Sequence, residues 1–199
     1  MGKSRAKRAI TRADILSPEA FLEVRRERRA ALVAAKRLRR VEVGPFATFL
    51  FESYDTMWWQ IHEMLRIEKG GEAQIADELA AYGPLVPKGD ELVATLMFEI
   101  EDPVRRERIL SSLGGVEETV TLAVGDDTIN AVPERDVVRT DPTGKTSSVH
   151  FLHFPFTAAQ IAAFRDPAQR VVLAIDHEGY SHLAVLPEAV RRTLSEDFD

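Results

Sequence analysis

Side chains that could bind a ligand or assist a reaction recur at helical spacing between Glu52 and Arg66. At about 100° per residue, five of them fall within about 40° of one line along a helix. They are Glu52, Thr56, Trp59, Glu63 and Arg66, with Gln60 beside them. Apolar residues occupy the opposite side: Tyr54, Met57, Trp58, Ile61 and Leu65. We therefore predict a helix with one face on a core and a second face, the polar stripe, that binds a ligand or a partner.

Part of the polar stripe resembles a zinc-binding motif but lacks its second ligand. His62-Glu63-Met64-Leu65-Arg66 follows the pattern H-E-x-x-H up to the last position, where Arg66 replaces the histidine. The motif works because two histidines one turn apart bind the same ion, whereas a guanidinium repels a cation. A simpler interpretation is an ion pair between Glu63 and Arg66, which are three residues apart.

A second metal hypothesis draws on residues from several segments. Glu52, Glu63 and Glu99, with His150 as an imidazole donor, could bind iron or manganese. Carboxylates suit hard cations, and a histidine shifts the preference towards transition metals. His153 cannot join His150, because residues three apart on a strand point to opposite faces. The competing interpretation, which we favour, is that these carboxylates are solvated or paired with cations inside the protein.

Trp59 is the member of the polar stripe that a solvated face explains least well. Tryptophan and arginine together are the composition of binding hot spots, and Trp59 shares the stripe with Arg66. The same helix could instead be covered on both sides within a compact domain. The sequence leaves these two interpretations open.

The composition is that of an ordinary globular chain without thiol chemistry. Of its 199 residues, 45% are hydrophobic and 29% charged, so one sizeable core is expected. The absence of cysteine excludes disulfides, thiolate nucleophiles and iron–sulfur ligation. No apolar run reaches the roughly 18 residues of a membrane span, and the basic start lacks the apolar core of a signal peptide. We therefore expect a cytoplasmic protein.

Charge is distributed unevenly along the chain. Residues 1–40 hold 13 of the 26 basic residues and 4 of the 32 acidic ones, giving +9, and residues 41–199 carry −15. The basic part could contact nucleic acid or lie against the acidic remainder. We favour the second, because no aromatic residues for base stacking are interleaved with the cations. Residues 1–16 are predicted to form a basic disordered tail, followed by one domain over residues 17–199.

Helices dominate the first half of that domain. Ser17-Pro18-Glu19 is a helix start, and cations crowd the other end of the helix near Arg40. Its apolar face could pack on the rest of the domain or on a second copy, which would make a homo-oligomer. Residues 46–51 are ambiguous: they could form a strand before a helix from Asp55, or belong to one long helix from Pro45 to about Lys69. We prefer the long helix, because the polar stripe then includes Glu52. A further helix is expected over residues 72–82.

Strands dominate the second half. Alternating patterns and turn residues predict strands over 92–100, 116–124, 129–132, 148–156, 170–175 and 181–186, with helices over 103–113, 157–165 and 187–198. The order is typical of an α+β fold with a mostly antiparallel sheet, and not of a doubly wound nucleotide-binding fold. Gly70-Gly71 and Gly114-Gly115 lack the remaining positions of phosphate-binding loops.

Several of these segments together resemble a known family. The similarity lies in Arg39-Arg40-Val41, Val43-Gly44-Pro45, Gln60 to Glu68, Leu92 to Glu99 and Val149 to Leu152. They resemble an uncharacterised bacterial family, domain of unknown function number three thousand five hundred and one. The resemblance implies no catalytic residues or cofactor, because none are assigned in that family. Genes of the family often lie beside rubrerythrin and an iron–sulfur oxidoreductase, which implies a link to peroxide or redox-stress metabolism.

Two functions remain in competition. The first is an accessory protein that uses the polar stripe to bind a small ligand or a protein partner of a redox pathway. The alternative is a metal-dependent enzyme using Glu52, Glu63, Glu99 and His150. Nucleic-acid binding through residues 1–40 is a third and weaker hypothesis, and no membrane partner is expected.

Overall fold

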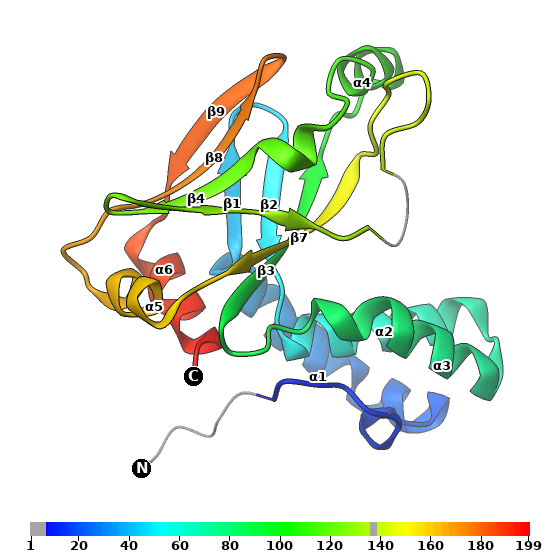
Figure 1. The fold of residues 1–199 in the computed structure, drawn as a ribbon. Helices are drawn as coiled ribbons and strands as arrows, with labels where there is room; N and C mark the ends of the chain where they lie inside the picture. Colours follow the sequence, from blue (N-terminus) through cyan, green and yellow to red (C-terminus); the bar gives the residue numbers. More distant parts are fainter. Residues whose placement is uncertain (1–6, 136–138) are drawn as a thin grey trace.

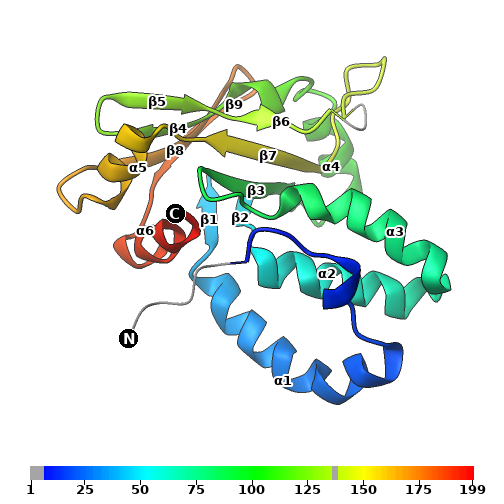
Figure 2. The same cartoon turned by 60° about the horizontal axis from the view of Figure 1, so that its bottom comes forward.

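Six α-helices flank a core of strands in the part of the chain that the computed structural model describes, residues 7–135 and 139–199. The helices are α1 (Pro18–Arg37), α2 (Tyr54–Glu68), α3 (Gly71–Tyr82), α4 (Pro103–Leu110), α5 (Ala158–Arg165) and α6 (Glu188–Leu194). Short 3-10 turns occur at Arg12–Asp14, Gly83–Leu85, Val116–Thr119 and Ser195–Asp197. The first three helices lie together on one side of the strands, and α5 and α6 lie elsewhere, as Figures 1 and 2 show.

The strands form two antiparallel sheets. They are β1 (Arg40–Val43), β2 (Ala47–Phe51), β3 (Glu91–Phe98), β4 (Val120–Val124), β5 (Asp127–Asn130), β6 (Val132–Pro133), β7 (Val149–Pro155), β8 (Val171–His177) and β9 (Tyr180–Val185). One sheet has the order β1-β2-β3-β7-β6 and the other β5-β4-β8-β9. A group of N-terminal helices beside antiparallel sheets confirms the predicted α+β class, although β1 and β2 precede α2.

The main core lies between the sheets. Every second residue of β4 and β8 is buried, as are the aromatic residues Phe49, Phe51 and Phe154. Phe164 of α5 and Phe198 near the C-terminus close one end of this core with their rings edge to face, 5.5 Å between centroids. Apolar burial of this extent is the main stabilising contribution to the fold.

The preferred long helix from Pro45 is wrong. Residues 47–51 form β2, which pairs with β1 and β3, and α2 begins only at Tyr54. Alternation of buried aromatic residues suits a strand better than a helix. Ser53 then caps α2 by accepting a hydrogen bond from the Thr56 backbone amide at 3.3 Å, and the Thr56 hydroxyl accepts one from the Ser53 amide at 2.8 Å.

Residues 10–15, which the sequence analysis placed in a disordered tail, pack on the helices. Ile10 and Ile15 are buried in a second core with Phe21 of α1 and Trp58 of α2. The Trp58 indole donates a hydrogen bond to the Asp14 carbonyl at 2.8 Å. Apolar burial of two isoleucines outweighs the basic character of this segment. The first six residues of the predicted tail lie outside the described chain.

Most remaining elements follow their predicted ranges. The helix from Pro103 ends at Leu110, and residues 116–119 form a 3-10 turn before β4 instead of its first part. Two-residue turns at residues 125–126 and 178–179 join β4 to β5 and β8 to β9. None of the described helices is long and apolar enough to cross a membrane.

Candidate functional site: the groove between the first two helices

The beginning of the polar stripe is buried and does not face solvent. Glu52 lies between β2 and α2 with 3% of its surface exposed, and Thr56 with 2%. The Thr95 hydroxyl of β3 donates a hydrogen bond to Glu52 Oε1 at 2.5 Å, while Oε2 has no hydrogen-bond partner within the described structure. Burial raises the pKa of the Glu52 carboxyl, and the Thr56 and Thr95 hydroxyls only partly oppose this effect. Neither residue is available to a partner at the surface.

The rest of the polar stripe meets α1. Arg25 Nε donates to Glu63 Oε1 at 2.7 Å, Arg66 donates to Oε2 at 3.1 Å, and the Arg25 guanidinium lies 5.7 Å from the Trp59 ring centre. The hydrogen bond from Arg25 is the main reason that the pKa of the Glu63 carboxyl is lowered. The predicted Glu63–Arg66 pair is confirmed, and Gln60 beside it is half-buried. This half of the stripe joins two helices.

The four residues of the metal hypothesis are not brought together. Glu52 lies beside Val93, because its amide donates to the Val93 carbonyl, whereas the Glu99 amide donates to the Phe46 carbonyl. Six residues of extended strand separate those two points, or about 20 Å. Glu99 is instead bound by Arg40 at 2.5 Å and by the Thr48 hydroxyl at 2.6 Å. Within residues 7–135 and 139–199, no group of three or more His, Asp or Glu side chains could hold a metal ion.

His150 is a core histidine on β7. It is fully buried, and its Nε2 donates to the Ser147 carbonyl at 2.9 Å. Its Nδ1 lies 3.6 Å from Glu117 Oε2, too far for a hydrogen bond. Burial lowers the pKa of the imidazole despite that carboxylate. The polar neighbours of its ring are Thr146, Ser147 and Glu117, and not Glu52 or Glu63.

The basic N-terminal part lies against the acidic remainder, as the sequence analysis favoured. Arg8, Arg12, Arg25, Arg39 and Arg40 each form an ion pair with an acidic residue beyond position 41. Five of the 13 basic residues of residues 1–40 are therefore paired with acidic residues of the remainder. The outer side of α1 differs: Arg26, Arg29 and Arg37 are exposed and form no ion pair with another described residue.

A groove separates the later part of α1 from α2. We call it the α1–α2 groove: it has a volume of about 160 Å³ and is lined by Arg28, Ala31, Leu32, Ala35, Asp55, Trp58 and Trp59. Phe21 holds the first turn of α1 against both tryptophans with edge-to-face contacts at 5.9 and 5.6 Å. Further along, α1 presents alanines to the tryptophans, and these small side chains do not fill the space between the helices. Trp59 therefore contributes to a concave apolar surface.

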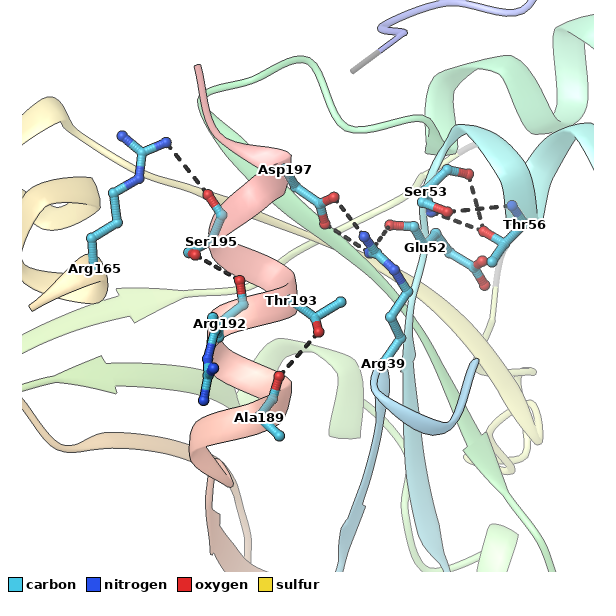
Figure 3. A network of polar contacts seen from close by, with 10 residues as sticks. All are labelled: Arg39, Glu52, Ser53, Thr56, Arg165, Ala189, Arg192, Thr193, Ser195 and Asp197. Carbon is cyan, nitrogen blue, oxygen red and sulfur yellow. Dashed lines mark hydrogen bonds and ion pairs between the residues drawn. The ribbon is translucent and has the colours of Figure 1, made fainter. Parts of the chain in front are cut away.

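The groove opens towards a larger cavity, because the two share Arg28, Leu32, Ala35 and Asp55. That cavity has a volume of about 1070 Å³ and extends from Lys7 and Arg8 to the residues after α6. Its wall contains Arg39, which donates two hydrogen bonds to Asp197, at 2.8 and 2.7 Å, and one to the Glu52 carbonyl at 3.1 Å (Figure 3). Both partners of this ion pair are buried.

Sequence reasoning missed the Arg39–Asp197 pair. The two residues are 158 positions apart, and neither sits in a motif for an ion pair. Figure 3 also shows Arg165 of α5 beside the segment that carries Asp197, where its guanidinium donates to the Ser195 carbonyl at 3.4 Å. A signal existed only in the resemblance, whose first motif contains Arg39.

The fold and the site define a small α+β domain in which a helical layer with a groove rests on two antiparallel sheets. The family model described as "Protein of unknown function (DUF3501)" matches residues 9–198, so the chain belongs to that family. A solved structure of a protein of unknown function from Burkholderia pseudomallei is 39% identical, with a TM-score of 0.88 over 96% of this chain and 100% of that one. A search of curated proteins gives no match. The family resemblance seen in the sequence is confirmed.

Proposed function

We propose that this protein is an accessory protein of a peroxide or redox-stress system and binds a protein partner in the α1–α2 groove. The observation that carries the proposal is the groove itself, in which two tryptophans and a leucine form an apolar wall beside Arg28. The partner-binding role expected of the whole polar stripe is thereby assigned to Trp59 and its neighbours on α1. Its other members serve inside the protein.

The chemistry of the groove favours a protein ligand with an apolar side chain next to an acid. Tryptophan and arginine dominate binding hot spots because they bury large areas and form directional contacts. The Arg28 guanidinium lies 5.4 Å from the Trp58 ring centre and forms no ion pair with a described residue. An acidic group of the partner can therefore pair with Arg28 while an apolar group enters between Ala31 and Trp59.

The unpaired cations on the outer side of α1 support the same choice. Arg26, Arg29 and Arg37 extend positive charge beyond the groove. Such charge accelerates association with an acidic surface and contributes less to the final affinity. The link to redox metabolism rests on the family resemblance and the gene setting that it implies.

Binding to a rubrerythrin, the class of protein that the family resemblance implies as a neighbour, tests the proposal. Trp58 and Trp59 are the two tryptophans of the chain, so tryptophan emission reports on the groove directly when the partner is added. We expect a saturable change in emission and a matching binding isotherm in calorimetry. If a purified rubrerythrin and an iron–sulfur oxidoreductase of the class that the resemblance implies both fail to bind, the redox assignment is wrong.

A pair of matched variants locates the interaction. Ala31→Phe places a large side chain in the groove, whereas Ala34→Phe makes the same change at an exposed position of α1 that does not line it. We expect Ala31→Phe to weaken binding by at least about tenfold, because loss of one buried side chain costs more than 1.4 kcal/mol. Ala34→Phe should bind as the unmodified protein does. Equal affinity of both variants for the partner would exclude the α1–α2 groove as the binding site.

A further inference from the structure

The segment that leads into α1 is held on α2 by two side chains about one helical turn apart. We call residues 10–16 the N-terminal strap, and Figure 2 shows it in dark blue beside α2. The Trp58 indole donates a hydrogen bond to the Asp14 carbonyl at 2.8 Å. The Leu16 amide donates one to His62 Nε2 at 3.0 Å. Backbone groups of the strap are therefore bonded directly to these two rings.

Both hydrogen bonds of the His62 ring require the same protonation state. Nδ1 lies 2.7 Å from the Trp58 carbonyl, which can only accept, so Nδ1 carries the proton. The Leu16 amide can only donate, so Nε2 must present its lone pair. The two bonds thus require a neutral imidazole with its proton on Nδ1. A second proton, on Nε2, would point at the Leu16 N–H and remove the one acceptor that this amide has among the described residues.

The surroundings of His62 favour its neutral form. The residue is 2% exposed, and its ring centre lies 3.9 Å from that of Trp58 and 4.8 Å from that of Phe21. Within residues 7–135 and 139–199, no carboxylate forms a hydrogen bond with the imidazole. Burial lowers the pKa of His62, and the bond to the Trp58 carbonyl opposes this only in part. The aromatic rings attract a cation weakly and do not replace the lost bond to Leu16.

The charged groups on the elements around His62 do not titrate in the histidine range. These groups are the carboxylates Asp14, Glu63 and Glu72 and the cations Lys7, Arg12, Arg25, Arg28 and Arg66. A hydrogen bond from a lysine or arginine lowers the pKa of each carboxyl. Lysine and arginine remain protonated far above neutral pH. Between about pH 5 and 8, His62 is therefore the member of this group that changes its charge.

We propose that protonation of His62 releases the N-terminal strap from α2, so that the strap opens in acid. Neutral His62 stabilises the closed strap above the ordinary histidine pKa, and this contribution is lost as pH falls through the lower pKa of the folded protein. Because one proton is taken up on opening, the equilibrium constant for opening should rise by up to about tenfold per pH unit. Opening exposes Ile10 and Ile15, which are buried in the second core. This inference does not depend on the α1–α2 groove or on its partner.

Amide hydrogen exchange of the full chain, resolved by nuclear magnetic resonance between about pH 5 and 8, tests the proposal. After correction for the intrinsic exchange rate, protection of the Leu16 amide should fall by up to about tenfold per pH unit below about pH 6.5. Protection of the Leu173 amide on β8, a central strand of the core, should stay constant and thereby exclude global unfolding. Constant protection of the Leu16 amide over this range overturns the proposal.

Two matched variants assign the effect to His62. His62→Gln keeps an acceptor for the Leu16 amide but cannot be protonated, so its protection of Leu16 should not depend on pH. His182→Gln removes an exposed histidine of β9 and should behave as the unmodified protein does. If His62→Gln loses protection in acid to the same extent as the unmodified protein, the proposal is wrong.

The protonation state of His62 can also be measured without any variant. At about pH 8, the ¹⁵N chemical shifts of the imidazole should place the proton on Nδ1, as its two hydrogen bonds require. A proton on Nε2 at that pH would contradict the hydrogen bond from Leu16 and overturn the proposal.

Discussion

Two similar carboxylates near the opposite ends of α2 lie in opposite environments. At the beginning of the helix, Glu52 is buried with one hydroxyl bonded to it, and its second oxygen has no hydrogen-bond partner in the described structure. One helical turn past Trp59, Glu63 is partly exposed and receives hydrogen bonds from two arginines. Burial raises the pKa of the first carboxyl, and cations lower the pKa of the second.

The difference shows that neighbours across the fold, not spacing along the helix, decide what a polar residue does. Both residues occupy the same arc of an ideal helix, yet Glu52 precedes α2 and Glu63 faces α1. Arg39, which also donates to the Glu52 carbonyl, gives both terminal nitrogens to Asp197 and none to the Glu52 carboxylate. The first region therefore holds its charges inside the protein, and the second uses them to join helices.

The largest expected effect concerns the ion pair that borders the Glu52 region. Arg39→Ala leaves the buried Asp197 carboxylate without its partner, and such a loss costs about 3 to 5 kcal/mol. Urea unfolding followed by circular dichroism measures the loss of free energy of unfolding.

An exposed pair provides the control for that measurement. Arg192→Ala removes the partner of Glu188, and both of these side chains are more than two-thirds exposed. We expect a change of at most about 0.5 kcal/mol. The double variant Arg39→Met with Asp197→Leu should recover much of the stability lost in Arg39→Ala, because no unpaired charge remains. Equal effects of Arg39→Ala and Arg192→Ala would contradict the buried role of Arg39.

Next in size is the removal of the Glu52 charge. Glu52→Gln should increase the free energy of unfolding at pH 8 by about 1 to 3 kcal/mol, since a buried carboxylate with an unsatisfied oxygen is costly. Because the pKa of Glu52 is higher in the folded than in the unfolded protein, its contribution to stability decreases as pH rises above the ordinary glutamate range. The advantage of the variant should therefore shrink towards pH 4. An advantage that grows on acidification would show that Glu52 is stabilised as an anion.

Glu63→Gln should have a smaller effect of the opposite sign. The substitution replaces charge-assisted hydrogen bonds from Arg25 and Arg66 by neutral ones, which should cost about 1 kcal/mol at pH 7. The pKa of Glu63 is lowered by folding, so its stabilising contribution is present above the ordinary glutamate range and disappears as pH falls through the folded value. When thermal unfolding is measured from pH 3 to 8, the melting temperatures of the variant and the unmodified protein should converge in acid. A difference in melting temperature that stays constant with pH would argue against the Arg25 pair.

The smallest effect tests the same rule on a histidine. His153 on β7 lies between Glu91, 2.8 Å from Nδ1, and Glu134, 3.1 Å from Nε2. The pKa of His153 is raised, and the hydrogen bond to Glu91 is the main cause. Its stabilising contribution is thus complete below the ordinary histidine pKa and is lost as pH rises through the folded value.

We expect less than about 1 kcal/mol from this histidine, because the three side chains are partly exposed. Amide exchange in the short edge strand β6 should accelerate at alkaline pH beyond the intrinsic increase of the exchange rate. The variant His153→Gln should lack this extra acceleration. If His153→Gln keeps the extra acceleration, another titrating group controls amide exchange in β6.

Element types were predictable where local signals agree. The start of α1 at Ser17-Pro18 and the strand from Glu91 to Phe98 combine strong caps or alternation with suitable side chains. The prediction for residues 46–51 was wrong because a short apolar run fits both a strand and a helix. Pairing of residues 47–51 with β1 and β3 makes them a strand, and β3 (Glu91–Phe98) lies outside any local window of sequence.

The candidate site was predictable only in part. The Glu63–Arg66 ion pair was predictable, because the two residues share one helix and one face. Trp59 lines the groove, and its role in binding stays a prediction. The alanines of α1 that form the other wall of the groove carry no chemical signal of their own. Glu99 and His150 looked suitable as metal ligands by type, but their positions on the sheet keep them with Arg40 and Ser147.

By itself, the sequence determined the α+β class, most of the helices and strands, and the segregation of positive charge at the N-terminal end. These properties follow from local patterns and from composition, which each segment carries wherever it lies. Only the tertiary structure decided that Glu52 is buried, that Arg25 neutralises Glu63 and that small residues of α1 leave a groove beside Trp59. The reason is physical: burial and pairing depend on which surfaces meet, and those surfaces come from segments that are far apart in the chain.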